Sequence, residues 1–332
     1  MAMQNRKEIW VFAETCDGVP VPVYQELLGK ASELADAMDD AAVCGVILGE
    51  NCDSAIASAA AMGTSRIYTV EHEKLAARHY ESDVYALEHL ARTHQPELIL
   101  VGATALGAEL APTLAARLKT GLAAHCVDLR LGNGRVNCMV PAFGGRVISE
   151  IYIPQARPML ASVRPGIFSA RELPAVPEPE IIREDSAFLD DFVPREEFVS
   201  FFPHVATGKK LEEADTVVCA GRGVSEGPVW ERLNQLADCL DASVGYTRSF
   251  ADLELVPDES NMIGTSGKSV RPKVYIGFGI SGATHHVCGM NKSKLVISVN
   301  RDPKAKMFQY SDYGAVSDAD KILTALLAEL KK

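Results

Sequence analysis

The feature that most constrains the fold is a repeated alternation of short apolar runs with segments of helical periodicity. In the first half of the chain, apolar runs predict strands at residues 9–13, 43–48, 66–70 and 98–101. Segments with helical spacing separate or follow them, at residues 24–38, 54–61, 79–93 and 110–118. Continuous apolar strands that alternate with helices are typical of a parallel sheet covered by helices on both faces. The sequence therefore predicts an N-terminal α/β domain.

The pattern changes in the middle of the chain. Residues 127–163 are rich in predicted strands, with turns at Gly132–Gly134 and Gly144–Gly145. Residues 171–210 carry several prolines and many acidic side chains, which we interpret as a last extended piece followed by an interdomain linker. A chain of 332 residues is long enough for two domains. We expect one domain over residues 1–205 and a second over residues 206–332.

The alternation of strands and helices starts again after the predicted linker. Strands are predicted at residues 216–220, 243–245, 273–276 and 294–299, and helices at 230–240 and 319–330. This order is typical of a Rossmann-like, doubly wound domain. The predicted fold is thus a two-domain α/β protein, with a parallel-sheet, nucleotide-binding-like base followed by a doubly wound domain.

Charge and composition narrow the classes of partner. The formal net charge is -11, and an acidic surface repels phosphate backbones, so we expect no nucleic acid partner. No stretch approaches the roughly 20 uninterrupted apolar residues that span a bilayer, so we expect no membrane insertion. The N-terminal residues lack the long apolar core of a signal peptide, which favours a cytoplasmic protein. The eight cysteines include no C-x-x-C pair, and we predict no metal site.

One glycine-rich segment is the strongest local signal. Residues 277–282 read G-F-G-I-S-G, which matches G-x-G-x-x-G, and they follow a predicted strand and precede a predicted helix. Asn300 and Asp302 end the next strand, at about the distance expected of a ribose-binding residue. Glycines let backbone N–H groups approach a pyrophosphate, and a helix N-terminus favours its negative charge. An ordinary tight turn also fits the six residues, but their context favours dinucleotide binding.

Three further segments in the same domain suit a polar ligand. Gly221-Arg222-Gly223 follows the first strand, where an arginine can hold phosphate in a bidentate manner, although a surface arginine fits as well. Residues 264–269 resemble the phosphate-binding loop of nucleotide triphosphatases, but Met262 occupies the position of its first glycine and no strand precedes it. We therefore reject a triphosphatase. The third segment is the pair His285-His286. Adjacent histidines are more often one exposed and one packed residue than a catalytic pair.

Taken together, these residues resemble the α subunits of electron-transfer flavoproteins. The segment VYIGFGISGATHHVCGM, residues 274–290, is similar to a family signature in which GISG is followed by a histidine and GM. The segments GRGV, GYTRSFAD, GTSGK, VNRDP and FQYSDYGAVSD occur in the family order, and LAARLKTGLAAHCVDL, PAFGGRVISEI and ARPMLASVRPGIF extend the likeness to the N-terminal half. The resemblance implies a heterodimer with a β subunit and one FAD, held mainly by the C-terminal domain. It implies an electron carrier that needs no catalytic residue of its own.

The resemblance also implies individual contacts to FAD. Arg222 would contact the phosphate region, and Thr247 and Arg248 the isoalloxazine ring. The loop of Ile263, Gly264, Thr265 and Ser266 would reach the N5 edge. The segment of Ser281, Gly282, Ala283, Thr284, His285 and His286 would wrap the pyrophosphate and ribityl chain, with His286 facing the flavin O2. The ADP moiety would be bound by Asn300, Asp318 and Ala319. Reduction places negative charge near N1 and O2, so a cationic arginine and a histidine donor there stabilise the reduced cofactor.

This sequence departs from the family pattern at two places. The family loop commonly reads G-Q-T-G, whereas this chain has G-T-S-G at residues 264–267. The family commonly has glutamine where this chain has His285. Thr265 removes an amide contact toward the flavin or phosphate, and His285 adds a titratable group near the cofactor. Both changes bear on the flavin potential and leave FAD binding in place.

The resemblance implies a carrier between acyl-CoA dehydrogenase-type flavoenzymes and a second redox partner. That partner is a membrane quinone reductase, or else NADH and ferredoxin in a bifurcating complex with a second FAD largely in the β subunit. An alternative is an NAD-dependent dehydrogenase that uses residues 277–282, although the motif lies near the C-terminus and no catalytic Lys, His or Tyr of a substrate domain is evident. A nucleotide-binding regulatory module without a redox role is a third possibility.

Overall fold

The computed structural model describes residues 7–38, 41–76, 80–143, 147–195, 199, 211–253, 255–256 and 260–330. The chain divides into two compact units, one of Met1–Ala142 with Val147–Phe201 and one of Phe143–Arg146 with Phe202–Lys332. The boundary expected between residues 205 and 206 and the turn expected at Gly144–Gly145 lie outside the described residues. Within the described residues, no helix has both the length and the apolar character needed to cross a bilayer.

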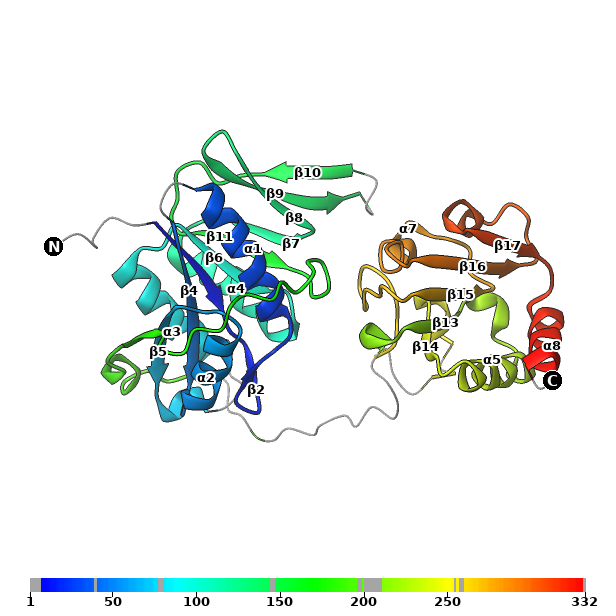
Figure 1. Cartoon of the computed structure of the whole chain (residues 1–332), viewed down its shortest axis with the longest axis horizontal. Coiled ribbons are helices and arrows are strands. Elements are labelled where there is room, and N and C mark those ends of the chain that lie inside the picture. Colours follow the sequence, from blue (N-terminus) through cyan, green and yellow to red (C-terminus); the bar gives the residue numbers. More distant parts are fainter. Residues whose placement is uncertain are drawn as a thin grey trace. The chain divides into compact units, whose positions relative to one another are not determined.

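A seven-stranded parallel sheet forms the centre of the first unit, in the order β12-β5-β4-β1-β6-β11-β7 (Figure 1). Its strands are β1 (Glu8–Phe12), β4 (Ala42–Gly49), β5 (Arg66–Glu71), β6 (Leu98–Gly102), β7 (Leu122–Cys126), β11 (Met159–Val163) and β12 (Glu180–Arg183). The helices are α1 (Val23–Ala37), α2 (Asp53–Ala61), α3 (Tyr80–His94) and α4 (Ala105–Leu118). The alternation of strands and helices predicted this parallel sheet correctly.

Strand β1 explains why the apolar runs are continuous. Ile9 and Val11 belong to the core cluster that includes α1 and α2, whereas Trp10 and Phe12 belong to the cluster that includes α3 and α4. Successive side chains of a strand point to opposite faces, so a sheet covered on both faces needs apolar residues at every position. The first unit therefore has two cores, one on each side of its sheet.

Helix α4 begins earlier than its apolar spacing predicts. It starts at Ala105, whereas the sequence indicated a helix from residue 110. The Thr104 hydroxyl accepts a hydrogen bond from the backbone N–H of Gly107 at 3.0 Å, which caps the first turn. The early start follows from this cap, a local signal that the apolar spacing does not contain.

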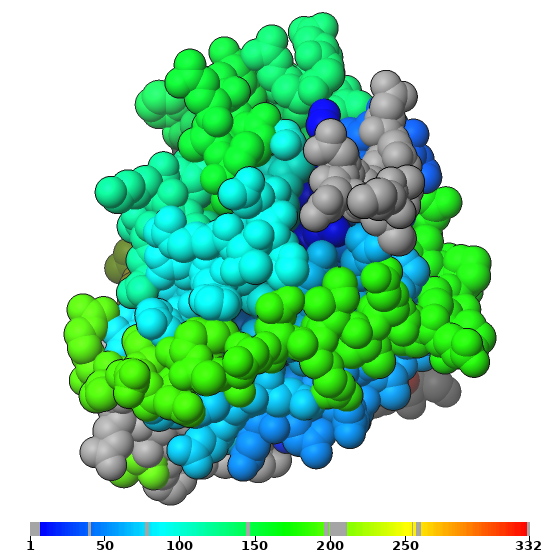
Figure 2. Space-filling model, turned by 90° about the vertical axis from the view of Figure 1, so that its left-hand side faces the viewer, coloured from blue at the N-terminus to red at the C-terminus, as the bar shows by residue number. Residues whose placement is uncertain are grey.

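The described part of the proline-rich segment after β11, residues 171–195, packs on the first unit. Its residues 180–183 form β12, which pairs in parallel with β5 at the edge of the sheet. Further on, the Lys74 ammonium donates to the carbonyl oxygens of Leu189, Asp190 and Phe192 at 2.9, 2.6 and 2.9 Å. In Figure 2 this green segment crosses a surface made of earlier, blue and cyan, parts of the chain. The extended piece expected from the sequence is thus an edge strand followed by a segment that Lys74 holds through its backbone carbonyl groups.

The strand-rich middle region forms an antiparallel sheet of β8 (Asp128–Gly132), β9 (Arg135–Ala142) and β10 (Val147–Ile151). Between β8 and β9, Asn133 and Gly134 have φ values of 53° and 72°. Two consecutive left-handed residues are typical of the tight turns that join hairpins. The turn predicted at Gly132–Gly134 is therefore confirmed. A small hairpin of β2 (Thr15–Cys16) and β3 (Val19–Pro20) was not predicted.

The second unit contains a five-stranded parallel sheet in the order β14-β13-β15-β16-β17. The strands are β13 (Thr216–Ala220), β14 (Ser243–Tyr246), β15 (Val274–Phe278), β16 (Leu295–Asn300) and β17 (Tyr313–Val316). Helices α5 (Gly227–Cys239) and α8 (Ala319–Leu330) contribute to the core on one face (Figure 1). The core on the other face uses loop residues and the short α7 (Thr284–Val287).

The strand order of the second unit creates a switch point. The chain runs from β13 to β14 on one side and then to β15 on the other side of β13. The connections that leave β13 and β15 therefore diverge, and a crevice opens at the carboxyl ends of these strands. This is the place where doubly wound sheets bind ligands.

Candidate functional site

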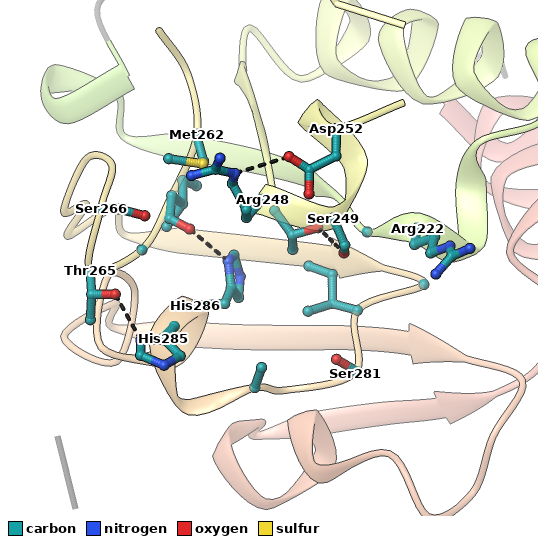
Figure 3. A pocket seen from close by; sticks show the side chains of 17 residues that line it. Arg222, Arg248, Ser249, Asp252, Met262, Thr265, Ser266, Ser281, His285 and His286 are labelled. Atoms are coloured by element: carbon teal, nitrogen blue, oxygen red, sulfur yellow. Dashed lines mark hydrogen bonds and ion pairs between the residues drawn. The ribbon is translucent and has the colours of Figure 1, made fainter. Parts of the chain in front are cut away.

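A pocket of about 630 Å³ lies at this switch point (Figure 3). Its walls come from the segments that follow β13, β14 and β15 and from the loop around Gly264. The lining residues are Gly221, Arg222, Thr247, Arg248, Ser249, Asp252, Met262, Ile263, Gly264, Thr265, Ser266, Gly279, Ile280, Ser281, Ala283, His285 and His286. The volume is within the range of small-molecule and cofactor sites.

Two glycine turns touch at the floor of this crevice. A Cβ atom on Gly221 would lie 2.3 Å from the carbonyl oxygen of Gly279, and one on Gly279 would lie 2.7 Å from the Cα of Gly223. Gly279 also has a φ of +65°, a conformation that favours glycine. Only glycines allow the turns after β13 and β15 to meet this closely. The contact leaves bare backbone at the carboxyl ends of both strands.

The glycine motif differs in detail from the predicted fingerprint. Gly277 lies inside β15, so the turn itself begins at Gly279. The helix that follows, α7, has only four residues. So short a helix aligns few peptide units, so its dipole can add little to the binding of a phosphate. The close approach of backbone remains, and it comes from two turns instead of one.

Two arginines lie in the pocket wall. Arg222 is exposed, and the structure gives its guanidinium no acidic partner among the described residues. Arg248 is the first residue of α6 (Arg248–Ala251), and its Nε donates to Oδ1 of Asp252 at 3.0 Å (Figure 3). Guanidinium groups remain charged at any working pH and fit phosphate oxygens well. Arg222 can therefore pair with an anion at no cost to an internal ion pair.

The neighbouring Thr247 is buried and shares a hydrogen bond with Ser249. Their hydroxyl oxygens are 3.2 Å apart. Ser249 and Ser281 are exposed in the same pocket. These hydroxyl groups can donate or accept, so the wall offers adaptable polar contacts beside its two arginines.

His286 is buried and fully engaged within the protein. Its Nδ1 lies 3.0 Å from the carbonyl oxygen of Ile263, which can only accept, so Nδ1 carries the proton. Its Nε2 then accepts from the Tyr275 hydroxyl at 2.7 Å. Burial lowers the pKa of His286 to about 4 and keeps the ring neutral. A donor role toward flavin O2, which the resemblance implies, would require one of these two hydrogen bonds to be given up.

His285 has the opposite environment, since it is exposed at one end of the pocket (Figure 3). Its Nδ1 lies 3.0 Å from the Thr265 hydroxyl, and its backbone oxygen accepts from the Thr265 N–H at 2.8 Å. The pair thus consists of one exposed and one packed histidine, as such pairs commonly do.

Most of the residues that the sequence indicated are brought together in this pocket. They are Arg222, Thr247, Arg248, Ile263, Gly264, Thr265, Ser266, Ser281, Ala283, His285 and His286. The other predicted residues, Gly282, Thr284, Asn300, Asp318 and Ala319, do not line it.

These other residues support the turn and the last helix. A Cβ on Gly282, whose φ is +81°, would lie 2.1 Å from the backbone nitrogen of Met307. Asn300 donates from Nδ2 to the carbonyl oxygen of Ile280 at 2.8 Å, which holds the glycine turn. Asp318 accepts from the N–H of Asp320 at 2.9 Å where α8 begins with Ala319. Thr284 is the first residue of α7.

Several lining residues were missing from the predicted site, namely Gly221, Ser249, Asp252, Met262, Gly279 and Ile280. Gly221 and Gly279 belong to motifs that the sequence analysis identified, and Ile280 is in the same motif. The i, i+4 spacing of Arg248 and Asp252 was a readable signal for Asp252. Met262 and Ser249 carry no local signal.

The fold and the pocket define the second unit as a doubly wound, dinucleotide-binding domain. Residues 9–188 match the family model described as the electron transfer flavoprotein domain, and residues 210–291 match the electron transfer flavoprotein FAD-binding domain. The chain is 35% identical to the electron transfer flavoprotein subunit alpha of Thermoanaerobacterium thermosaccharolyticum, over 99% of both chains. It is 36% identical to protein FixB of Rhizobium meliloti, over 97% of this chain and 92% of that one. It is 34% identical to the electron transfer flavoprotein subunit alpha of Megasphaera elsdenii, over 100% of this chain and 98% of that one.

The chain belongs to the electron transfer flavoprotein α subunit family, and its C-terminal unit binds FAD. The pocket fits this cofactor. Its touching glycine turns admit a pyrophosphate, the guanidinium of Arg222 has no acidic partner among the described residues, and hydroxyl groups line the wall. The family normally pairs with a β subunit.

Proposed function

We propose that this chain holds the FAD through which electrons pass between acyl-CoA dehydrogenase-type flavoenzymes and a second redox partner. The observation that carries the proposal is the pocket at the switch point of the C-terminal unit, which combines bare backbone, two arginines and several hydroxyls. Such a wall binds and tunes a cofactor. The chain would act as an electron carrier and not as a stand-alone catalyst.

FAD, when bound, supplies reversible electron transfer, and the protein supplies binding and charge. Arg222 would hold the phosphate region, and Thr247 and Arg248 the ring system. The other contacts would come from residues 263–266 and 281–286, and from Asn300, Asp318 and Ala319 on the ADP side. The fixed charge of Arg248, partly balanced by Asp252, would raise the affinity of the site for the reduced, more negative cofactor.

We propose that residues 1–205 form the base that contacts the β subunit, and that residues 206–332 form the FAD domain. Exposed apolar side chains support a partner surface on the first unit. Val147 and Ile148 on β10 are 49% and 53% exposed, and Tyr152, which follows this strand, is 47% exposed. Because successive side chains of a strand point to opposite faces, β10 exposes apolar side chains on both of its faces, which a partner chain could cover.

The second redox partner would be a membrane quinone reductase, or NADH and ferredoxin in a bifurcating complex. The two differ in cofactor content. A bifurcating complex requires a second FAD, largely in the β subunit, whereas simple relay requires only the FAD of this chain. The number of FAD molecules per purified heterodimer therefore separates them.

The test is to express the chain with its β subunit and to purify the complex. We expect flavin absorbance bands, FAD at one or two molecules per heterodimer, and bleaching of the bands by an acyl-CoA and its dehydrogenase. Residues 1–205 alone should contain no FAD. A colourless complex that reduces NAD with a hydroxy substrate would contradict the proposal and favour an NAD-dependent dehydrogenase.

A further inference from the structure

We propose that Thr265 and His285 act as one proton-responsive unit in the wall of the FAD pocket, so that FAD affinity and midpoint potential depend on the charge of His285. The proposal rests on the FAD-binding role of this pocket. It assigns His285 as a positioning residue that acts partly through the Thr265 hydroxyl.

The first support is the double connection between the two residues. The Thr265 hydroxyl is 3.0 Å from Nδ1 of His285, and the Thr265 N–H donates to the His285 carbonyl oxygen at 2.8 Å (Figure 3). Gly264, with a φ of +150°, lies so close that a Cβ there would be 2.8 Å from the same carbonyl oxygen. The backbone therefore fixes the side-chain contact, and both residues line the pocket.

The second support is that the contact joins two separate segments of the pocket wall, the loop that contains Gly264 and the short α7. The two residues are 20 positions apart in the chain, yet the structure places them in hydrogen-bonding contact. Thr265 and His285 thus form one hydroxyl–imidazole pair that connects the loop to α7.

The chemistry of the pair depends on one proton. While the imidazole is neutral with its lone pair on Nδ1, the Thr265 hydroxyl donates to that nitrogen. Uptake of a proton from solvent makes both ring nitrogens donors, so Nδ1–H donates to the hydroxyl oxygen instead. The hydrogen bond reverses, and the hydroxyl hydrogen becomes free to donate elsewhere. Protonation thus adds one positive charge and one available donor at this end of the pocket.

Among the charged and titratable side chains around the pair, His285 is the one that we expect to take up the proton. The titratable and charged side chains on its own element, on the loop it contacts and across the pocket are His286, Cys288, Lys268, Arg222, Arg248 and Asp252. His286 is buried and neutral, Lys268 pairs with Glu212 at 3.0 Å, and Arg248 pairs with Asp252 at 3.0 Å. Histidine is the side chain whose charge ordinarily changes between pH 5 and 8.

The direction of the effect follows from charge. FAD carries a negative pyrophosphate, and its reduced form is more negative than its oxidised form. A protonated His285 should therefore tighten FAD binding and raise the potential. We expect a change in affinity of about twofold to fivefold, as for other exposed charge pairs. For a one-electron couple the same factor in the ratio of reduced to oxidised affinity corresponds to about 18–41 mV.

The experiment uses the full chain in complex with its β subunit. The dissociation constant and midpoint potential of FAD are measured from pH 5.5 to 8.5 in wild type, His285→Gln, Thr265→Val and His89→Gln. His285→Gln removes the titration, and Thr265→Val removes the hydroxyl at nearly constant shape. The exposed His89 is on α3 of the other unit and serves as the control. In parallel, NMR follows the His285 ring with and without FAD.

We expect an additional pH dependence in wild type and His89→Gln that is absent in His285→Gln and altered in Thr265→Val. FAD should shift the NMR titration of His285 to higher pH, because binding linkage is reciprocal. Identical pH profiles in wild type and His285→Gln, or a His285 titration that FAD does not move, would overturn the inference while FAD binding stands. A complex that binds no FAD would overturn both this inference and the proposed function.

Discussion

The charge of Arg248 leads to a prediction with a worked magnitude. A hydrogen bond to a charged group contributes about 1.5–3 kcal/mol when it is well formed. In this structure the Arg248 and Asp252 side chains are 59% and 55% exposed and lie 3.0 Å apart, so water and the carboxylate both weaken the field of the guanidinium. We therefore expect about 0.5–1.5 kcal/mol of stabilisation of the reduced cofactor, which equals about 20–65 mV for a one-electron couple.

Arg248→Ala should lower the first reduction potential of FAD by that amount, because a positive charge stabilises an added electron. Asp252→Asn should raise it, because the guanidinium then loses the opposing charge of Asp252. Spectroelectrochemical titration of the complex with the β subunit measures both shifts.

Arg232→Ala is a matched control. Arg232 also pairs with an aspartate, Asp320, at 2.6 Å, and neither residue lines the pocket. This variant removes the same charge from the same unit and should leave the potential nearly unchanged. If Arg248→Ala and Arg232→Ala shift the potential equally, the effect is one of net charge, and the assigned role of Arg248 is refuted.

Three further predictions concern stability, each measured by urea unfolding. Burial lowers the pKa of His286 to about 4, so below pH 6.5 the unfolded state takes up a proton that the folded state excludes. The free energy of unfolding of the C-terminal unit should therefore fall by about 2–3 kcal/mol between pH 6.5 and 4.5, and His286→Phe should remove this pH dependence. Burial and the nearby charge of Glu14 raise the pKa of Asp83 to about 8, so the stability that its proton provides is fully present below pH 4 and is lost as the pH rises to 8. Asp83→Asn should be more stable than wild type at pH 8 by a few kcal/mol, and its free energy of unfolding should not show this pH dependence. Thr104→Ala should cost about 1–2 kcal/mol, because it removes both the α4 cap and the hydrogen bond that the Thr104 hydroxyl donates to Glu14. Thr104→Ser keeps both contacts and should cost much less, and an equal cost for the two variants would exclude the hydroxyl as the cause.

The fold was largely predictable because each buried strand carries its own signal. In β1, burial on both faces requires the continuous apolar run at residues 9–12, and the same holds for β13. Edge strands lack this requirement. In both β12 and β17 three of the four residues are exposed and none is fully buried, so neither strand carries an apolar run that stands out from its surroundings. Their positions are determined by pairing with a neighbour, which is tertiary information.

The candidate site divides in the same way. Segments such as Gly221–Gly223 and residues 277–282 could be identified one at a time, since each carries a local pattern. The contact of Gly221 with Gly279 could not, because it depends on the strand order that places β13 beside β15. Asn300 has a contact of the second kind. Its amide donates to the backbone of the glycine turn, a structural role that its position in the sequence does not reveal.

The two adjacent histidines illustrate how one short helix gives neighbouring residues opposite roles. Consecutive residues of α7 point about 100° apart, so His286 faces Tyr275 in the core while His285 faces the Thr265 loop. Burial keeps His286 neutral, whereas His285 is exposed in the pocket wall. The same kind of substitution should therefore have different consequences at the two positions. A change at His286 should alter the pH dependence of folding, and a change at His285 should alter the pH dependence of the FAD potential. If a change at His286 altered the pH dependence of the FAD potential, and a change at His285 altered that of folding, the environments assigned to the two side chains would be refuted.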